Sequence, residues 1–254
     1  MFERVIEFTA PKIYTDQAKL RGGLPKPIKL NIPEWYKKLE HNLKSSTAKG
    51  CAPFLDTLSF GYVLSLPVDI KINHNILKEN KETGKKERDS EYEFPLKAPL
   101  ENLGVNLNTM ADPSFHPIKQ LEGSPLIEKN KNLPFYKIFN PWTIKTPPGY
   151  SCLFVPPLNN TDDRFSIIPG IVDTDLYPNE INFPFCINGD KYPNLDTMLK
   201  RGIPYVQIIP FKRDNWKMKI STKTTQDFKD AQPIWPLSLI HNYKLDIWNK
   251  KKCD

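Results

Sequence analysis

The sequence predicts a mainly β fold with antiparallel strands, built as a β-clip, a barrel or a jelly-roll-like sandwich with a few short peripheral helices. Short runs of β-branched and aromatic residues are separated by turn residues, above all in the second half of the chain. The 25 prolines are dispersed among apolar residues, which favours short strands and fixed turns over long helices. The alternating helical stretches of a wound βαβ fold are missing from the pattern.

The composition excludes several classes of protein. With 254 residues, of which 39% are hydrophobic, the chain is long enough to bury a sizeable core without disulfides or metals. No apolar run approaches the roughly 20 residues that a membrane-spanning helix requires. Acidic side chains lie between Met1 and Glu7, where a signal peptide is apolar. The four cysteines form no C-x-x-C pair, which argues against a zinc ribbon. We therefore expect a protein that has no contact with a membrane and is not secreted.

The net charge of +7 permits contact with nucleic acid or with another acidic surface. No recognised nucleic-acid motif accompanies this charge, and part of the excess is a basic tail at 250–252. We therefore do not expect nucleic acid as a partner, and we expect a protein partner or a homo-oligomer.

The first 50 residues predict a strand, a loop and a short helix that pack on the main body. Apolar and polar residues alternate over 2–9, which is typical of a half-buried strand. Glycines and prolines over 19–29 predict a connecting loop. A proline followed by a glutamate and spaced apolar residues predicts a helix over 32–39, in which Trp35 is expected to be a core anchor.

The next part of the chain predicts strands with one solvated loop. Alternating apolar residues over 57–72 are interrupted by Pro67, which predicts either one long strand or two strands jointed at this proline. The charged stretch over 80–91 has no periodicity and predicts a hairpin loop that ends at a strand around Phe94.

The densest pattern lies between Phe139 and Trp216. Strands separated by Pro and Gly turns are predicted there and just before it, over 135–157 as a strand–turn–strand unit and then over 165–172, 180–187 and 204–211. Apolar residues with helix-like spacing predict a C-terminal helix over 237–252. No internal repeat is evident, and residues 1–254 are expected to form a single β-rich domain.

Asp173 and Asp175 are the candidate catalytic or metal-binding residues. In an extended segment both side chains face the same side, and two carboxylates so placed can hold a divalent cation or position a water. The alternative is a pair of turn-forming aspartates at a strand end, which cap backbone amides. We predict no cofactor, and a divalent metal at these two residues stays open as the alternative.

Basic and aromatic residues near the end of the last predicted strand suggest a binding surface. Arg213 and Trp216 combine positive charge with an aromatic face, and Trp142 adds another aromatic ring. Such groups stack on bases or aromatic ligands, or they are hot spots of protein interfaces. We favour the interface. The four histidines show no metal-binding spacing, although a jelly roll would suit an iron-dependent oxygenase.

Two resemblances add to this interpretation. The runs IPEWYK (32–37), CAPFLDTLSFGY (51–62), KIFNPWTIKTPPGYS (137–151), GIVDTDLY (170–177) and GIPYVQIIPFKRDNW (202–216) resemble an uncharacterised protein family of tailed marine phages. This resemblance implies a viral protein, located in a virion or in the cytoplasm of an infected host cell. It implies no activity.

Residues 170–181, followed by Gly202 and Gln207, are also similar to motifs of trimeric dUTPases and dCTP deaminases, which are β-clip enzymes. This resemblance implies that Asp173 orients an attacking water, that Tyr177 backs a sugar, and that Gln207 lies at a subunit contact near the phosphates. No glycine follows Gly202, so the Gly-rich arm that covers the phosphates in those enzymes has no counterpart here.

The leading hypothesis is a non-enzymatic β-rich viral protein that acts by binding, as a virion component or an interaction module. The first alternative is a divergent dUTPase-like or dCTP deaminase-like enzyme that binds or hydrolyses a nucleotide. The second alternative is a jelly-roll metal-dependent oxygenase. The predicted ligand-binding residues are Trp142, Tyr177, Gln207, Arg213 and Trp216.

Overall fold

The fold is mainly β and antiparallel, as predicted. The structure is a computed structural model that describes residues 4–42, 45–67, 69–79, 82–83, 86–89, 118–126, 136–138, 140–192, 194–230 and 243–254. Within these ranges the strands form sheets of two, five, three and three strands, and every strand pair is antiparallel. No helix in the same ranges is long and apolar enough to cross a membrane.

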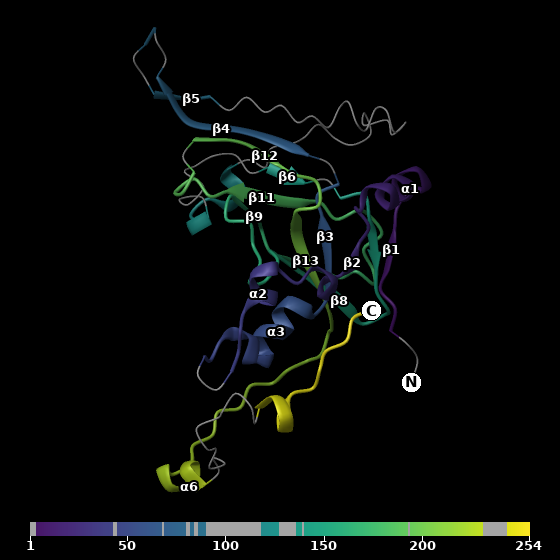
Figure 1. Ribbon diagram of the computed structural model, residues 1–254, viewed down its shortest axis with the longest axis vertical. Helices are drawn as coiled ribbons and strands as arrows, with labels where there is room; N and C mark the ends of the chain where they lie inside the picture. The colour runs from purple at the N-terminus through teal and green to yellow at the C-terminus, as the bar shows by residue number, and fades with distance from the viewer. Residues whose placement is uncertain are drawn as a thin grey trace.

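The five-stranded sheet, whose labelled strands lie in the middle of Figure 1, positions the candidate site. Its strands follow in the order β10 (Gly170–Val172), β8 (Tyr150–Val155), β13 (Pro204–Lys212), β3 (Tyr62–Ser65) and β2 (Lys26–Pro27). β13 is the longest of them and lies between β8 and β3. β10 is an outer strand that pairs with β8 alone.

Three further sheets complete the β structure. The first has the order β6 (Tyr136–Ile138), β11 (Phe183–Ile187) and β9 (Phe165–Ile167). The second, drawn at the top of Figure 1, has the order β12 (Asn194–Leu199), β4 (Ile70–Glu79) and β5 (Lys86–Asp89). The third pairs β1 (Glu7–Thr9) with β7 (Thr143–Lys145).

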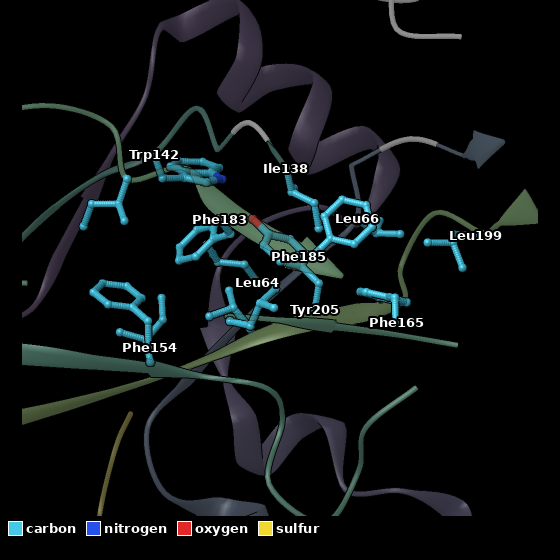
Figure 2. Packing of buried hydrophobic residues seen from close by; sticks show 14 of the residues in the cluster. Leu64, Leu66, Ile138, Trp142, Phe154, Phe165, Phe183, Phe185, Leu199 and Tyr205 are labelled. Carbon is cyan, nitrogen blue, oxygen red and sulfur yellow. The ribbon is translucent and has the colours of Figure 1, made fainter. Parts of the chain in front are cut away.

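The hydrophobic core lies between the five-stranded sheet and the β6–β11–β9 sheet. Figure 2 shows Phe183 and Phe185 of β11 among side chains of the larger sheet. The ring of Phe183 lies 5.5 Å from that of Phe154 on β8 and 5.6 Å from that of Tyr205 on β13. These contacts across the two layers give a sandwich-like packing, in which offset and edge-on aromatic pairs are favoured.

The helices are short and peripheral. They are α1 (Lys12–Arg21), α2 (Glu34–Lys38), α3 (Ala52–Ser59) and α6 (Thr225–Asp230), with 3-10 turns at Ile28–Asn31, Ala48–Gly50 and Ile118–Leu121 and a π turn at Tyr243–Ile247. α2 confirms the helix predicted over 32–39. The prediction that Trp35 is a core anchor was wrong: it is 45% exposed, and its neighbour Tyr36 is buried and stacks on Phe54 instead.

Several of the predicted strands differ from the observed strands in their bounds or in the sheet to which they belong. The chain does form two strands around Pro67, but they belong to different sheets, and the beginning of the predicted range lies in α3. The single strand predicted over 165–172 is two strands in two sheets. The predicted hairpin loop contains β5, and its far end at Phe94 lies outside the described residues.

The C-terminal helix predicted over 237–252 was wrong over half of its described part. Residues 243–247 form one π turn, and 248–254 are not helical. The beginning of the predicted range, 237–242, lies outside the described residues.

Candidate functional site

Asp173 and Asp175 lie in a turn that follows the outer strand β10. The backbone N–H groups of Leu176 and Tyr177 donate to the Asp173 carbonyl oxygen at 3.0 and 2.9 Å. The segment is therefore folded back and not extended, so the alternation expected of a strand does not apply. The interpretation of the two residues as turn-forming aspartates is the one that agrees with this geometry.

The Asp175 carboxylate is held by the guanidinium of Arg213. Nη1 and Nη2 of Arg213 donate to the two carboxylate oxygens at 2.7 and 2.5 Å, and the Gly149 backbone N–H donates to Oδ2 at 2.8 Å. The Asp175 side chain is buried, so this bidentate contact satisfies both of its oxygens in a place of reduced solvent screening.

The same guanidinium reaches the second carboxylate. Arg213 Nη1 lies 3.2 Å from Asp173 Oδ1, which also accepts a hydrogen bond from the Ser151 hydroxyl at 2.6 Å. Nη1 further donates to the Ser151 hydroxyl at 3.0 Å and to the Tyr150 carbonyl oxygen at 3.1 Å. We call Asp173, Asp175 and Arg213 the carboxylate–arginine clamp. The cation between the two carboxylates is the protein's own guanidinium.

The local sequence explains why these three residues meet. Gly149 has φ of +82°, which lets the chain turn sharply between β7 and β8 and present its N–H to Asp175. β13 pairs with β8 up to Lys212 opposite Tyr150, and the Arg213 N–H then donates to the Gly149 carbonyl oxygen at 2.9 Å. The clamp therefore joins the β7–β8 turn, the turn after β10 and the end of β13.

The clamp shifts the acid–base behaviour of its members. The hydrogen bonds from Arg213, with a smaller contribution from the Gly149 N–H, lower the pKa of Asp175 from 3.8 to about 2. The pKa of Arg213 is raised, first by its hydrogen bonds to Asp175. Among the described residues no group of three or more His, Cys, Asp and Glu side chains is arranged to hold a metal ion.

The lowered pKa of Asp175 predicts a pH dependence of stability. Because the carboxyl binds a proton more readily in the unfolded chain, the clamp stabilises the fold above about pH 4, and this contribution is lost as the pH falls towards about 2. We expect Asp175→Asn to lower the melting temperature at pH 7, and the gap to wild type to narrow between pH 4 and pH 2. Thermal melts across this pH range, read by circular dichroism, measure it; a gap that stays constant with pH would contradict it.

Two of the predicted ligand-binding residues lie in the interior. Trp142 is buried in the core, where its ring makes an edge-on contact with Tyr14 at 5.9 Å. The Gln207 side chain is fully buried: its oxygen accepts from the Leu158 N–H at 2.9 Å, and its nitrogen donates to two backbone carbonyl oxygens of the α3 region. Both residues are therefore placed as parts of the scaffold and not on a surface that a ligand can reach.

Of the other three, Arg213 is part of the clamp, and Tyr177 and Trp216 are exposed. Tyr177 follows the Asp173–Asp175 turn, and Trp216 lies three residues after Arg213. Trp216 belongs to a segment whose extent the sequence interpretation missed. Every residue of 214–230 is exposed, and the segment runs away from the body of the protein towards α6 at the bottom of Figure 1. We call residues 214–230 the arm.

The chain returns from the arm and is fixed again at its C-terminal end. The Trp248 indole N–H donates to the Asp56 carboxylate of α3 at 3.0 Å, and Lys251 pairs with the same carboxylate at 2.8 Å. The Cys253 thiol is buried and accepts from the Gly61 N–H at 3.3 Å, and Asp254 pairs with Lys29. The chain is thus fixed before the arm, at the clamp, and again near its C-terminal end, on α3.

A signal for the arm was present in the sequence. Trp216, Met218 and Ile220 occupy every second position, and Lys217 and Lys219 lie between them. This alternation is typical of a half-buried strand. No protein-family model and no curated protein sequence matches this chain.

Proposed function

We propose that this chain is a non-enzymatic binding protein, an interaction module whose contact element is the arm. The observation that carries the proposal is the row of apolar side chains at Trp216, Met218 and Ile220, which are 90%, 89% and 81% exposed. Scattered exposed apolar residues need no explanation, but a contiguous row on a projecting segment is characteristic of a protein-binding surface. The Trp at its beginning is the residue type most enriched in interface hot spots.

The clamp supports this proposal as the anchor of the arm. Arg213 is the residue immediately before the arm, and its side chain and backbone are both bonded to neighbouring turns. A fixed root limits the directions that the arm can take, so less conformational entropy is lost when it binds. A virion or the cytoplasm of an infected cell, as the phage resemblance implies, would be the setting of such a module.

The nucleotide-enzyme alternative receives less support from the same geometry. Asp173 accepts a hydrogen bond from the Ser151 hydroxyl and lies beside the Arg213 guanidinium, and the buried Gln207 side chain is bonded within the core. A phosphate-side amide would need a side open to the ligand, and the buried Gln207 has none. Turnover of a nucleotide by the purified protein, or a thermal shift with a nucleotide that Asp173→Asn abolishes, would favour this alternative over the binding module.

Site-specific photo-crosslinking tests the proposed function. A benzophenone amino acid replaces Met218 in the arm, and a matched variant carries it at Leu20, which is equally exposed but lies on α1. We expect discrete protein crosslinks from position 218, either to a second copy in the purified protein or to a different protein in an extract of producing cells, and none from position 20. A position 218 that crosslinks no more than position 20 would contradict the proposal.

A further inference from the structure

We infer that the partner of the arm is a second copy of this chain, and that two copies exchange arms so that each arm lies along the β10 edge of the other. This inference rests on the proposed function and names the partner of the same element. Four features of the molecule support it: the strand pattern of the arm, the open edge of β10, the position of the clamp between them, and the area that a reciprocal exchange buries.

The arm has the side-chain pattern of a strand but has no sheet of its own. Apolar residues from Trp216 to Ile220 alternate with Lys217 and Lys219, so an extended backbone presents one apolar and one basic face. Strands with such a pattern are covered on the apolar face in folded proteins. Within the described part of the chain both faces of this segment are exposed, so a second copy can supply the surface that covers the apolar face.

The β10 edge is a matching acceptor. β10 pairs with β8 on one side, and in the described ranges no strand pairs with its other side, which is the rim of the five-stranded sheet and can accept an added strand. Ile171 on β10 is 63% exposed, and Leu176 and Tyr177 of the following turn are also exposed apolar residues.

Because of the clamp, the beginning of the arm and the β10 edge of the same chain lie close together. A two-fold symmetry axis can therefore place the arm of each copy on the β10 edge of the other. Arg213 is bonded to the turn that follows β10, so the root of each arm lies beside the acceptor of its own chain. An arm that bound its own β10 would have to reverse direction within residues 214 and 215, before Trp216. The arm runs away from the body instead (Figure 1). Two copies with adjacent roots and acceptors satisfy both arms in one symmetric, closed interface.

The buried area also favours a second copy over an unrelated partner. An aromatic side chain such as Trp216 buries about 150–250 Å², and Met218 and Ile220 add comparable apolar surface. One arm on a foreign surface stays near the lower limit of a specific interface. A reciprocal exchange doubles the area and reaches the roughly 1,200–2,000 Å² of stable protein–protein interfaces.

Sedimentation equilibrium and light scattering on the full chain test this inference. We expect the wild type to have twice the 29.4 kDa chain mass at micromolar concentration. The arm variant Trp216→Ser/Met218→Ser/Ile220→Ser should dissociate at least about a hundredfold more readily, because it loses three buried apolar side chains. The control variant Lys217→Gln/Lys219→Gln changes the opposite face of the same segment and should remain dimeric.

A variant of the acceptor separates arm exchange from other kinds of association. Ile171→Lys places a charge on the β10 edge and leaves the arm unchanged, and we expect it to be monomeric but folded, with the circular dichroism spectrum of the wild type, because Ile171 is exposed. Mixing it with the arm variant should restore a weak heterodimer, in which one intact arm meets one intact acceptor.

A wild type that stays monomeric would overturn the inference, and so would a dimer that Ile171→Lys leaves intact. The proposed function would survive either result if position 218 still crosslinked to another protein, and it would fail with the inference if no such crosslink formed. The two failures are therefore distinguishable.

Discussion

Replacing Gln207 by leucine is expected to destabilise the protein by about 3 kcal/mol or more. The side chain is fully buried and makes one accepted and two donated hydrogen bonds. Leucine is close in volume but leaves the Leu158 N–H and the carbonyl oxygens of Thr57 and Phe60 without their partner. Each buried polar group that loses its partner costs roughly 1–3 kcal/mol. Urea denaturation at neutral pH measures the loss as a lower midpoint with an unchanged slope.

A matched substitution controls for the chemical change itself. Gln226 in α6 is exposed, and its amide bonds only to Asp230 one turn later, at 2.7 Å. Gln226→Leu should therefore alter the free energy of unfolding by no more than about 0.5 kcal/mol. If Gln207→Leu were as stable as the wild type, Gln207 would not be the internal link between α3 and the sheet. The role that the nucleotide-enzyme resemblance implies for Gln207, at a subunit contact near the phosphates, would then be favoured instead.

The strands that could be predicted from the sequence are those whose residues are buried on both sides. The strand expected over 204–211 corresponds to β13 almost residue for residue, because an apolar run between Pro and Gly punctuation is typical of a central strand. β12, with the sequence NLDTML, was missed since it has no such run and is recruited by pairing along β4. α1 was missed because only Ala18 of its ten residues is buried, which leaves little periodicity.

The candidate site shows where prediction from the sequence ends. Asp173 and Asp175 were found as a chemically suggestive pair, but their partner Arg213 lies 38 residues beyond Asp175 in the chain. Arg213 and Trp216 were also found, as a basic–aromatic binding surface. The sequence cannot show that one of them faces inward to the clamp and the other outward on the arm. This division depends on β13 ending at Lys212, which is set by pairing with β8.

Gly61→Ala is expected to lower the free energy of unfolding by roughly 2–4 kcal/mol, through backbone strain and a steric conflict together. Gly61 has φ of +93°, a conformation that L-residues rarely adopt, and a methyl group there would lie 2.3 Å from the Ile208 carbonyl oxygen of β13. The Gly61 backbone cannot move away from β13 without disturbing its own hydrogen bonds. The Gly61 carbonyl oxygen accepts from the Ile28 N–H at 3.0 Å, and its N–H donates to the Cys253 thiol of the returning C-terminal segment.

Gly202→Ala is the control, since Gly202 has a similar φ of +87° but no atom within 4 Å of the added methyl group, so only the conformational cost of about 1 kcal/mol is expected. Equal losses for the two variants in urea denaturation would show that the contact with β13 relaxes freely. A larger loss at Gly61 would show that the close approach of the chain after α3 to β13 is fixed by its neighbours.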